Sequence, residues 1–236
     1  MSRYLLIDSL IIIFPLLLSF EKQIKFYTQY LSLLITFISV GIPFIVWDSV
    51  AASRGDWSFN ELYVGSLRIF SLPLEEILFF VVVLYATMFS YEVIRHFVFE
   101  RKVKVPKLFL YVLSCILCLL GFILIDKSYT STVLLVTAFT LFMSVRCFYA
   151  LISSIYYWLF IAATMILFFI FNYILTSIPV VLYGESAILG ARFLTIPVED
   201  ILYNYSMLTL YLGVYFLSRE KSKKKNQLSD YLSGGY

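Results

Sequence analysis

The chain contains the stretch Arg68-Ile-Phe-Ser-Leu-Pro73-Leu-Glu75-Glu76-Ile-Leu-Phe79-Phe80 and, 124 residues later, the stretch Arg192-Phe-Leu-Thr-Ile-Pro197-Val-Glu199-Asp200-Ile-Leu-Tyr203-Asn204. The arginine, the proline, the first acid and the Ile-Leu pair recur at a constant offset, and the second acid recurs as Glu or Asp. This recurrence indicates an internal duplication. Each copy places two adjacent acids at the head of an apolar segment, where an ionised side chain is costly and therefore predicts a functional role.

The composition is typical of integral membrane proteins and excludes an ordinary soluble fold. Of the 236 residues, 61% are apolar, 19% aromatic and only 14% charged. The first apolar stretch carries Asp8, and no small-residue cleavage site follows it, so we interpret it as a helix rather than a signal peptide. Since a spanning helix needs roughly 20 residues, we predict seven spans, within residues 4–20, 26–47, 77–91, 108–125, 128–145, 147–184 and 201–218.

The basic residues predict the orientation of these spans, because Lys and Arg accumulate in cytoplasmic segments. With the C-terminus inside, the inner segments hold 13 basic residues and the outer segments hold 5. We therefore expect a multi-pass protein of the plasma membrane with its N-terminus outside and its C-terminus in the cytoplasm.

The 124-residue offset relates the second span to the sixth and the third to the seventh, and leaves the fourth over. We predict an all-α membrane protein in which residues 1–100 form a first repeat, 101–127 a linker helix and 128–218 a second repeat. One extra helix keeps two three-helix repeats parallel, so both acidic motifs enter the bilayer from one side, around a pseudo-twofold axis. Residues 219–236 are basic and then small and polar, and predict a disordered cytoplasmic tail.

Helix geometry predicts which groups meet. Proline favours the first helical position, so Pro73 and Pro197 place the acids in a first turn. Adjacent residues point about 100° apart, so Glu75 and Glu76 lie on different faces. We expect carboxyls of the two repeats to meet across the pseudo-axis. Burial and a second acid disfavour ionisation, whereas the helix N-terminus and Arg68 or Arg192 favour it, which predicts one acid as proton donor and its partner as carboxylate.

These motifs resemble the small integral-membrane lycopene cyclases, over nearly the whole chain. The resemblance is carried by the doubled Pro-x-Glu-[Glu/Asp] motif and by segments such as Trp47-Asp48, Gly55-Asp-Trp57-Ser-Phe59-Asn60, Asn172, Tyr183 and Leu189-Gly190-Ala-Arg192. It implies a lycopene β-cyclase, an isomerase of the intramolecular lyase class that forms β-ionone rings without flavin. The sequence agrees in lacking a Gly-x-Gly-x-x-Gly dinucleotide loop.

The resemblance implies a chemistry for the acids and their neighbours. A carboxylic acid protonates C2 of the terminal alkene, the C5=C6 bond closes the ring, and a carboxylate removes the C6 proton, while aromatic faces stabilise the cation. The candidate catalytic residues are Glu75, Glu76, Glu199 and Asp200. Trp158 is a further aromatic candidate, and the candidate substrate-binding or orienting residues are Asp48, Trp57, Phe59, Arg68, Phe79, Phe80, Asn172, Arg192, Tyr203 and Asn204.

The partners expected from the resemblance are lycopene or a related acyclic carotene, the lipid bilayer and other membrane enzymes of carotenoid synthesis, with no cofactor and no nucleic acid. No metal is expected either, since Cys115-x-x-Cys118 lies in an apolar helix and reads as packing. Three alternatives stay open. The acids can be ordinary charges at helix N-termini, the chain can be a transporter of parallel-repeat architecture, or it can be a carotenoid hydratase that shares the protonation step. Asp8 has no assigned role.

Overall fold

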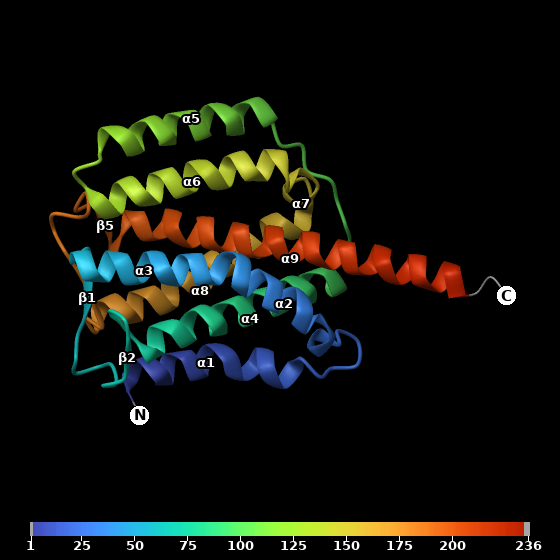
Figure 1. Ribbon diagram of the computed structural model, residues 1–236, viewed down its shortest axis with the longest axis horizontal. Coiled ribbons are helices and arrows are strands. Elements are labelled where there is room, and N and C mark those ends of the chain that lie inside the picture. The colour runs from blue at the N-terminus through green and yellow to red at the C-terminus, as the bar shows by residue number, and fades with distance from the viewer. Residues whose placement is uncertain (1, 234–236) are drawn as a thin grey trace.

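The computed structural model describes residues 2–233, and their side chains as far as Ser222. The chain is mostly helical (Figure 1). Each of the seven predicted apolar stretches lies on a helix or helical run. These are α1 (Arg3–Leu18), the run of α2 (Tyr30–Thr36), the π-helical turn η2 (Phe37–Gly41) and α3 (Ile42–Arg54), then α4 (Leu74–Phe97), α5 (Lys107–Ile123), α6 (Ser128–Arg146), α8 (Ile155–Ser177) and α9 (Val198–Ser233). Two short elements, η1 (Phe26–Gln29) and α7 (Tyr149–Ile152), lie between them.

Four helical segments of the described chain are long and apolar enough to cross a membrane: Phe26–Arg54, α4, α6 and α8. The helix α5 is apolar but shorter. Their outward faces carry many exposed leucine, isoleucine and phenylalanine side chains. An apolar surface of this extent is unfavourable in water and is typical of contact with lipid. The chain is a membrane protein.

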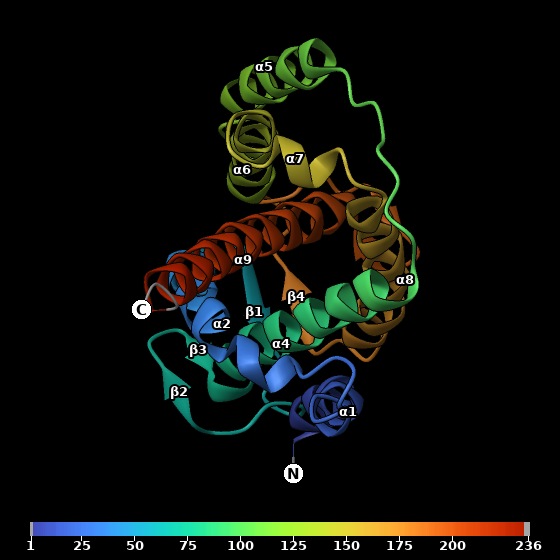
Figure 2. The same ribbon diagram turned by 90° about the vertical axis from the view of Figure 1, so that its right-hand side faces the viewer.

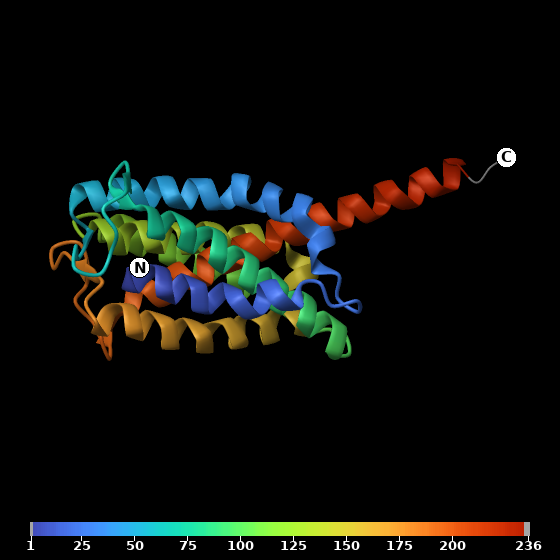
Figure 3. The ribbon, with the colours of Figure 1, turned by 90° about the horizontal axis from the view of Figure 1, so that it is seen from below.

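The long helices lie side by side, and consecutive ones run in opposite directions (Figures 1 and 3). Both loops that precede the acidic motifs therefore lie at one end of the bundle, together with the N-terminus. The C-terminus lies at the other end. We call these the motif end and the opposite end.

Two strands join the halves at the motif end. The strand β1 (Trp57–Phe59) pairs antiparallel with β4 (Val181–Tyr183), with Ser58 opposite Leu182 and Trp57 opposite Tyr183. Ser58 and Leu182 are themselves 124 residues apart, so exchanging the two halves returns the same pairing. The strand pair is therefore symmetric under exchange of the two halves, and Figure 2 shows the two strands in the middle of the bundle.

A small hairpin leads into each acidic helix. Strands β2 (Arg68–Ile69) and β3 (Leu72–Pro73) pair before α4, and β5 (Arg192–Phe193) and β6 (Ile196–Pro197) pair before α9. Their turns share a left-handed residue, Phe70 with φ of 53° and Leu194 with φ of 56°. Each helix begins one residue after its proline, not at the proline as predicted, and both acids of each motif lie in the first turn as predicted.

The halves differ at two places. The helix α5 packs on α6 at the edge of the bundle and has no counterpart beside α1 (Figures 1 and 2). The helix α9 continues to Ser233, within the segment from residue 219 for which the sequence predicted a disordered tail. Residues 234–236 of that predicted tail lie outside the described part of the chain.

A buried ionic cluster joins the two acidic helices near the opposite end. The Glu92 carboxylate of α4 accepts a hydrogen bond from the Tyr215 hydroxyl of α9 at 2.9 Å and pairs with Arg219 at 2.9 Å and with Arg95 at 3.4 Å. Glu92 is buried. A buried carboxylate with several charged and hydrogen-bonding partners fixes how two helices meet, because it loses these partners when the helices separate and water does not reach it in the packed bundle.

We expect Glu92→Ala to lower the free energy of unfolding by about 3–5 kcal/mol, because it leaves the buried Tyr215 hydroxyl and the half-buried Arg219 and Arg95 without their acceptor. Unfolding from mixed micelles by sodium dodecyl sulfate, followed by circular dichroism, measures the change. The control is Glu100→Ala, which removes a part-exposed pair with Lys102 at 3.9 Å and should cost less than about 1 kcal/mol. Equal losses in both variants would contradict a clamp at Glu92.

Candidate active site

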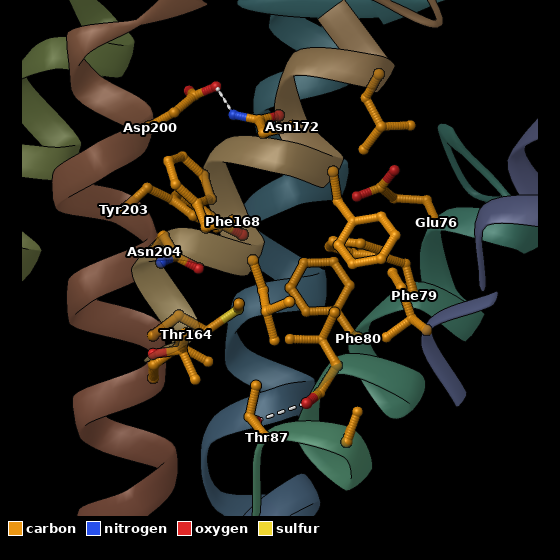
Figure 4. A pocket seen from close by; sticks show the side chains of 18 of the residues that line it. Glu76, Phe79, Phe80, Thr87, Thr164, Phe168, Asn172, Asp200, Tyr203 and Asn204 are labelled. Atoms are coloured by element: carbon orange, nitrogen blue, oxygen red, sulfur yellow. Dashed lines mark hydrogen bonds between the residues drawn. The ribbon is translucent and has the colours of Figure 1, made fainter. Parts of the chain in front are cut away.

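A cavity of about 460 Å³ lies between α1, α4, α8 and α9. Three carboxyls line it at the motif end, Asp48 of α3, Glu76 of α4 and Asp200 of α9, whereas most of the remaining wall is apolar or aromatic. Figure 4 shows Glu76 and Asp200 on opposite sides of this space, with Phe79, Phe80, Phe168 and Tyr203 between and below them. The second acid of each motif therefore faces a shared apolar chamber.

Glu76 sits among other acids. Its Oε2 accepts a hydrogen bond of 2.5 Å from the hydroxyl of Tyr4 on α1. Asp48 and Asp8 are both buried and both interact electrostatically with Glu76. Buried like charges repel strongly where water is excluded, so these three carboxyls cannot all be ionised together. At least one carboxyl of this group therefore carries a proton.

Asp200 has the opposite environment. Its carboxylate accepts hydrogen bonds from three side chains, Tyr129 at 2.7 Å, Tyr183 at 2.6 Å and Asn172 at 2.9 Å. Burial raises the pKa of Tyr183, on strand β4, well above its ordinary value, so this hydroxyl keeps its proton and remains a donor. Donors aimed at a carboxyl stabilise its charged form, and here they oppose the burial of Asp200, which disfavours that form.

The two walls have diverged from the duplicated pattern at the positions around these acids. Asp48 corresponds to Asn172 at the 124-residue offset. Counting from Tyr4 and Tyr129, Asp8 corresponds to Val133, which is buried. The first half thus surrounds its acid with carboxyls, and the second half replaces both with uncharged side chains. This difference gives the two acids different partners within one cavity, carboxyls around Glu76 and hydrogen-bond donors around Asp200.

Glu75 and Glu199 lie outside the residues that line this cavity. Glu75 Oε1 accepts from the Ser2 hydroxyl at 2.6 Å and from the Gly65 N–H at 2.8 Å. Glu199 Oε1 accepts in the same way from Thr130 at 2.6 Å and from the Leu189 N–H at 2.7 Å. The first acid of each motif therefore ties the preceding loop to the first helix of its repeat.

The cavity opens sideways between α1 and α8. Its lining includes Leu10 and Phe14 of α1 and Leu167 of α8, whose exposed fractions are 56%, 69% and 45%. Apolar side chains exposed at the mid-depth of membrane helices face lipid. An apolar molecule dissolved in the bilayer can reach the acids through this mouth without crossing water.

A family model described as Lycopene cyclase matches residues 2–94 and 126–217. The chain belongs to the lycopene cyclase family. The match covers the two repeats and leaves out residues 95–125, which contain α5. Among curated proteins and among solved structures, the comparisons found no match.

Membership of the lycopene cyclase family makes the chain an enzyme with a cyclase function in carotenoid biosynthesis, acting on a carotene in lipid. The cavity agrees with this membership in its apolar walls and lateral mouth. Among the described residues that line it, the ionisable side chains apart from tyrosines are Asp48, Glu76 and Asp200. An acid and a base are what a proton-initiated ring closure needs.

Most residues expected to contact substrate line the cavity of this lycopene cyclase. They are Asp48, Trp57, Phe59, Phe79, Phe80, Asn172, Tyr203 and Asn204. Arg68 and Arg192 are exposed, and among the described residues neither forms a salt bridge with the acids. Arg192 instead donates to the Thr195 carbonyl at 2.9 Å.

Two sequence predictions about the site are wrong. Trp158, expected near the acids, lies at the start of α8 and donates to the Ile152 carbonyl, because α8 runs toward the motif end and carries its first turn far from it. The second concerns the acids around Glu76: Asp48 and Asp8, which interact electrostatically with it, belong to its own half, whereas the sequence predicted that carboxyls of the two repeats meet across the pseudo-axis. Asp48 on α3 and Asp8 on α1 come close to Glu76 because these helices pack beside the start of α4.

The sequence analysis of this lycopene cyclase did not predict the tyrosines that donate hydrogen bonds to the acids. Tyr4 and Tyr129 begin the first helices of the two halves and donate to Glu76 and Asp200. They are 125 residues apart rather than 124. A comparison of the halves at the constant offset of the motif therefore does not align them with each other. Tyr183 lies in a resemblance segment, but its contact depends on the β1–β4 pairing.

We expect Glu199→Ala to lower the free energy of unfolding by about 1–3 kcal/mol, since it leaves the Thr130 hydroxyl and the Leu189 N–H without an acceptor. Glu199→Gln keeps an acceptor oxygen and should cost less. Thermal unfolding in detergent measures both. A loss of cyclisation in Glu199→Gln with unchanged stability would contradict a loop-anchoring role for this acid.

Proposed function

We propose that this protein is a lycopene β-cyclase, which closes the acyclic ends of lycopene into β-ionone rings by proton addition and proton removal, without net redox change. One observation carries the proposal: an acid surrounded by carboxyls and an acid held by three donors face each other across one lipid-accessible apolar cavity.

Glu76 is the proposed general acid. Its neutral carboxyl delivers a proton to C2 of the terminal trisubstituted alkene and leaves a tertiary cation at C1. Protonating such an alkene is difficult, so the donor has to be kept dry and close to the double bond. The carboxyl-rich environment of Glu76 and its place on the cavity wall support this assignment.

Asp200 is the proposed base. The C5=C6 double bond attacks C1, a bond forms between C1 and C6, and the positive charge moves to C5. Loss of the C6 proton to Asp200 then forms the new C5=C6 double bond of the β-ring. One proton enters and one leaves, so the reaction is an isomerisation. The three donors that stabilise the charged form of Asp200 support this role.

Aromatic faces are proposed to stabilise the cation between these steps. Phe79, Phe80 and Tyr203 line the cavity between the two acids. The negative face of an aromatic ring attracts a cation and does not add to it as a nucleophile. Trp57 and Phe59 close the motif end of the same chamber, and the resulting exclusion of water protects the cation from capture.

The shape of the cavity favours an enzyme over a transporter. Its polar groups gather mainly at the motif end, and its mouth opens between α1 and α8 rather than along the bundle axis. A long polyene can place one end beside the acids while the rest of the molecule extends through the mouth into lipid. A transport path for a polar solute would instead need polar groups along its length.

We further propose that all seven long helices cross the membrane, with the N-terminus outside and the C-terminus in the cytoplasm. The alternating direction of these helices supports this topology (Figure 3). The helices α1 and α5 have 16 and 17 residues, close to the lower limit of about 17 for a span. The excess of basic residues on the opposite end favours the orientation.

Expression in lycopene-accumulating cells followed by pigment chromatography tests the proposed function. The expected result is monocyclic and bicyclic β-ring carotenes in place of lycopene. Lycopene that remains unchanged in the presence of inserted protein would contradict it. A hydroxylated acyclic product would identify a hydratase instead, because water would then have captured the same cation.

A further inference from the structure

Asp8 is a buried acid that the proposed reaction leaves without a role. It lies on α1, its exposed fraction is 2%, and neither carboxyl oxygen has a hydrogen-bond partner among the described residues. An unpaired carboxylate in an apolar interior is very costly, whereas a neutral carboxyl is tolerated. Asp8 therefore holds a proton in the resting protein.

The position of Asp8 connects this proton to Glu76. Asp8 follows Tyr4 by four residues, so the two side chains lie on the same face of α1, and this face packs against α4. Tyr4 donates its hydroxyl to Glu76 and is an electrostatic neighbour of Asp8. The ionisable groups around Asp8 are thus Tyr4, Glu75 and Glu76.

Asp8 does not line the cavity, so it does not meet the substrate. Packing does not require an acid there either, because the corresponding position of the second half is filled by buried Val133. The acid occurs only in the half whose motif carries the proposed proton donor.

Resting on the proposed function, we infer that Asp8 is a positioning residue that reloads Glu76 with a proton after each ring closure. For this transfer the Asp8 carboxyl, which is unpartnered in the resting protein, turns to the Tyr4 hydroxyl one helical turn away. Its proton then passes to the Tyr4 oxygen as Tyr4 gives its own proton to the Glu76 carboxylate. Asp8 is left as a carboxylate and regains a proton from water at the motif end. The proton that Asp200 removed from C6 leaves to the same water, so each cycle is balanced.

Kinetics of the full chain in lycopene-loaded nanodiscs separate the two steps. Single-turnover measurements report ring closure itself, and steady-state measurements also include the reprotonation of Glu76 between turnovers. With enzyme in excess, Asp8→Asn should close the first ring at a rate within about twofold of the wild type, because Glu76 starts protonated. With lycopene in excess, its steady-state rate should fall by about tenfold or more, since acid–base transfer steps commonly contribute factors of this size or larger. Asp8→Glu should restore the steady-state rate.

Asp8→Val repeats the comparison with the residue that the second half carries, and serves if the asparagine variant does not accumulate. Equal rates to wild type in both regimes, or equal falls in both, would overturn the reloading role. A wild type that forms no ring at all would instead refute the proposed function. The Glu76→Gln control should lose ring formation under both single-turnover and steady-state conditions.

Discussion

Replacing Glu76 by glutamine is expected to abolish ring formation, so that lycopene-accumulating cells stay red. Glutamine has nearly the same volume and can still accept the Tyr4 hydrogen bond, but it has no acidic proton for C2 of the alkene. General acid–base groups contribute roughly 10²–10⁴-fold to a rate, and water cannot replace the donor inside an apolar cavity. We expect cyclic carotenes to fall at least about 100-fold, measured by pigment chromatography at matched protein levels.

The matched control is Glu75→Gln, the same change one residue earlier. Glu75 binds Ser2 and the Gly65 N–H and does not line the cavity, so most of the activity should remain. Cyclisation near the wild-type level in Glu76→Gln would remove this residue as the proton donor. Equal inactivation by the two changes, with both proteins inserted, would assign the effect to the helix start as a whole.

Replacing Asp200 by asparagine should likewise stop the reaction, at the step that removes the C6 proton. Three donors surround this position, and an amide offers them one acceptor oxygen and two N–H groups of its own. The variant loses its base and gains an unfavourable contact between donors. We expect a loss of about 10²–10⁴-fold in the formation of β-rings, with lycopene recovered unchanged.

Glu199→Gln controls for this change, because Glu199 precedes Asp200 on α9 and lies off the cavity. It should retain cyclisation. If Asp200→Asn produced β-rings at the wild-type rate, another group would have to accept the C6 proton, and Asp48 would be the next carboxyl on the cavity wall.

The sequence predicted the helices well, because apolar stretches in a membrane protein have few other structures available. It also predicted the duplicated helix starts and the different faces of Glu75 and Glu76, since these follow from local helix geometry. The hairpins before α4 and α9 and the β1–β4 pair were not predicted. They consist of two- and three-residue strands, too short to show an alternating pattern.

The site was predicted only in part, because its asymmetry depends on which residues of α1, α3, α6 and β4 reach the motifs. Sequence comparison of the halves showed that Asp48 and Asn172 differ, but not that they face Glu76 and Asp200. Helix packing brings Tyr4, Tyr129 and Asp8 to the motifs, and the β1–β4 pairing brings Tyr183 there. Trp158 failed as a candidate for the same reason, since aromatic residues are too common here for type to indicate position.

The central claim is that a carboxyl group of the protein transfers a solvent-exchangeable proton to C2 of the alkene. Ring closure by membranes equilibrated in deuterium oxide, with unlabelled lycopene, tests it most directly by mass spectrometry and NMR of the purified product. The account predicts one deuterium for each ring formed, located at C2. Rings that form at the normal rate and carry no deuterium at that carbon would contradict it.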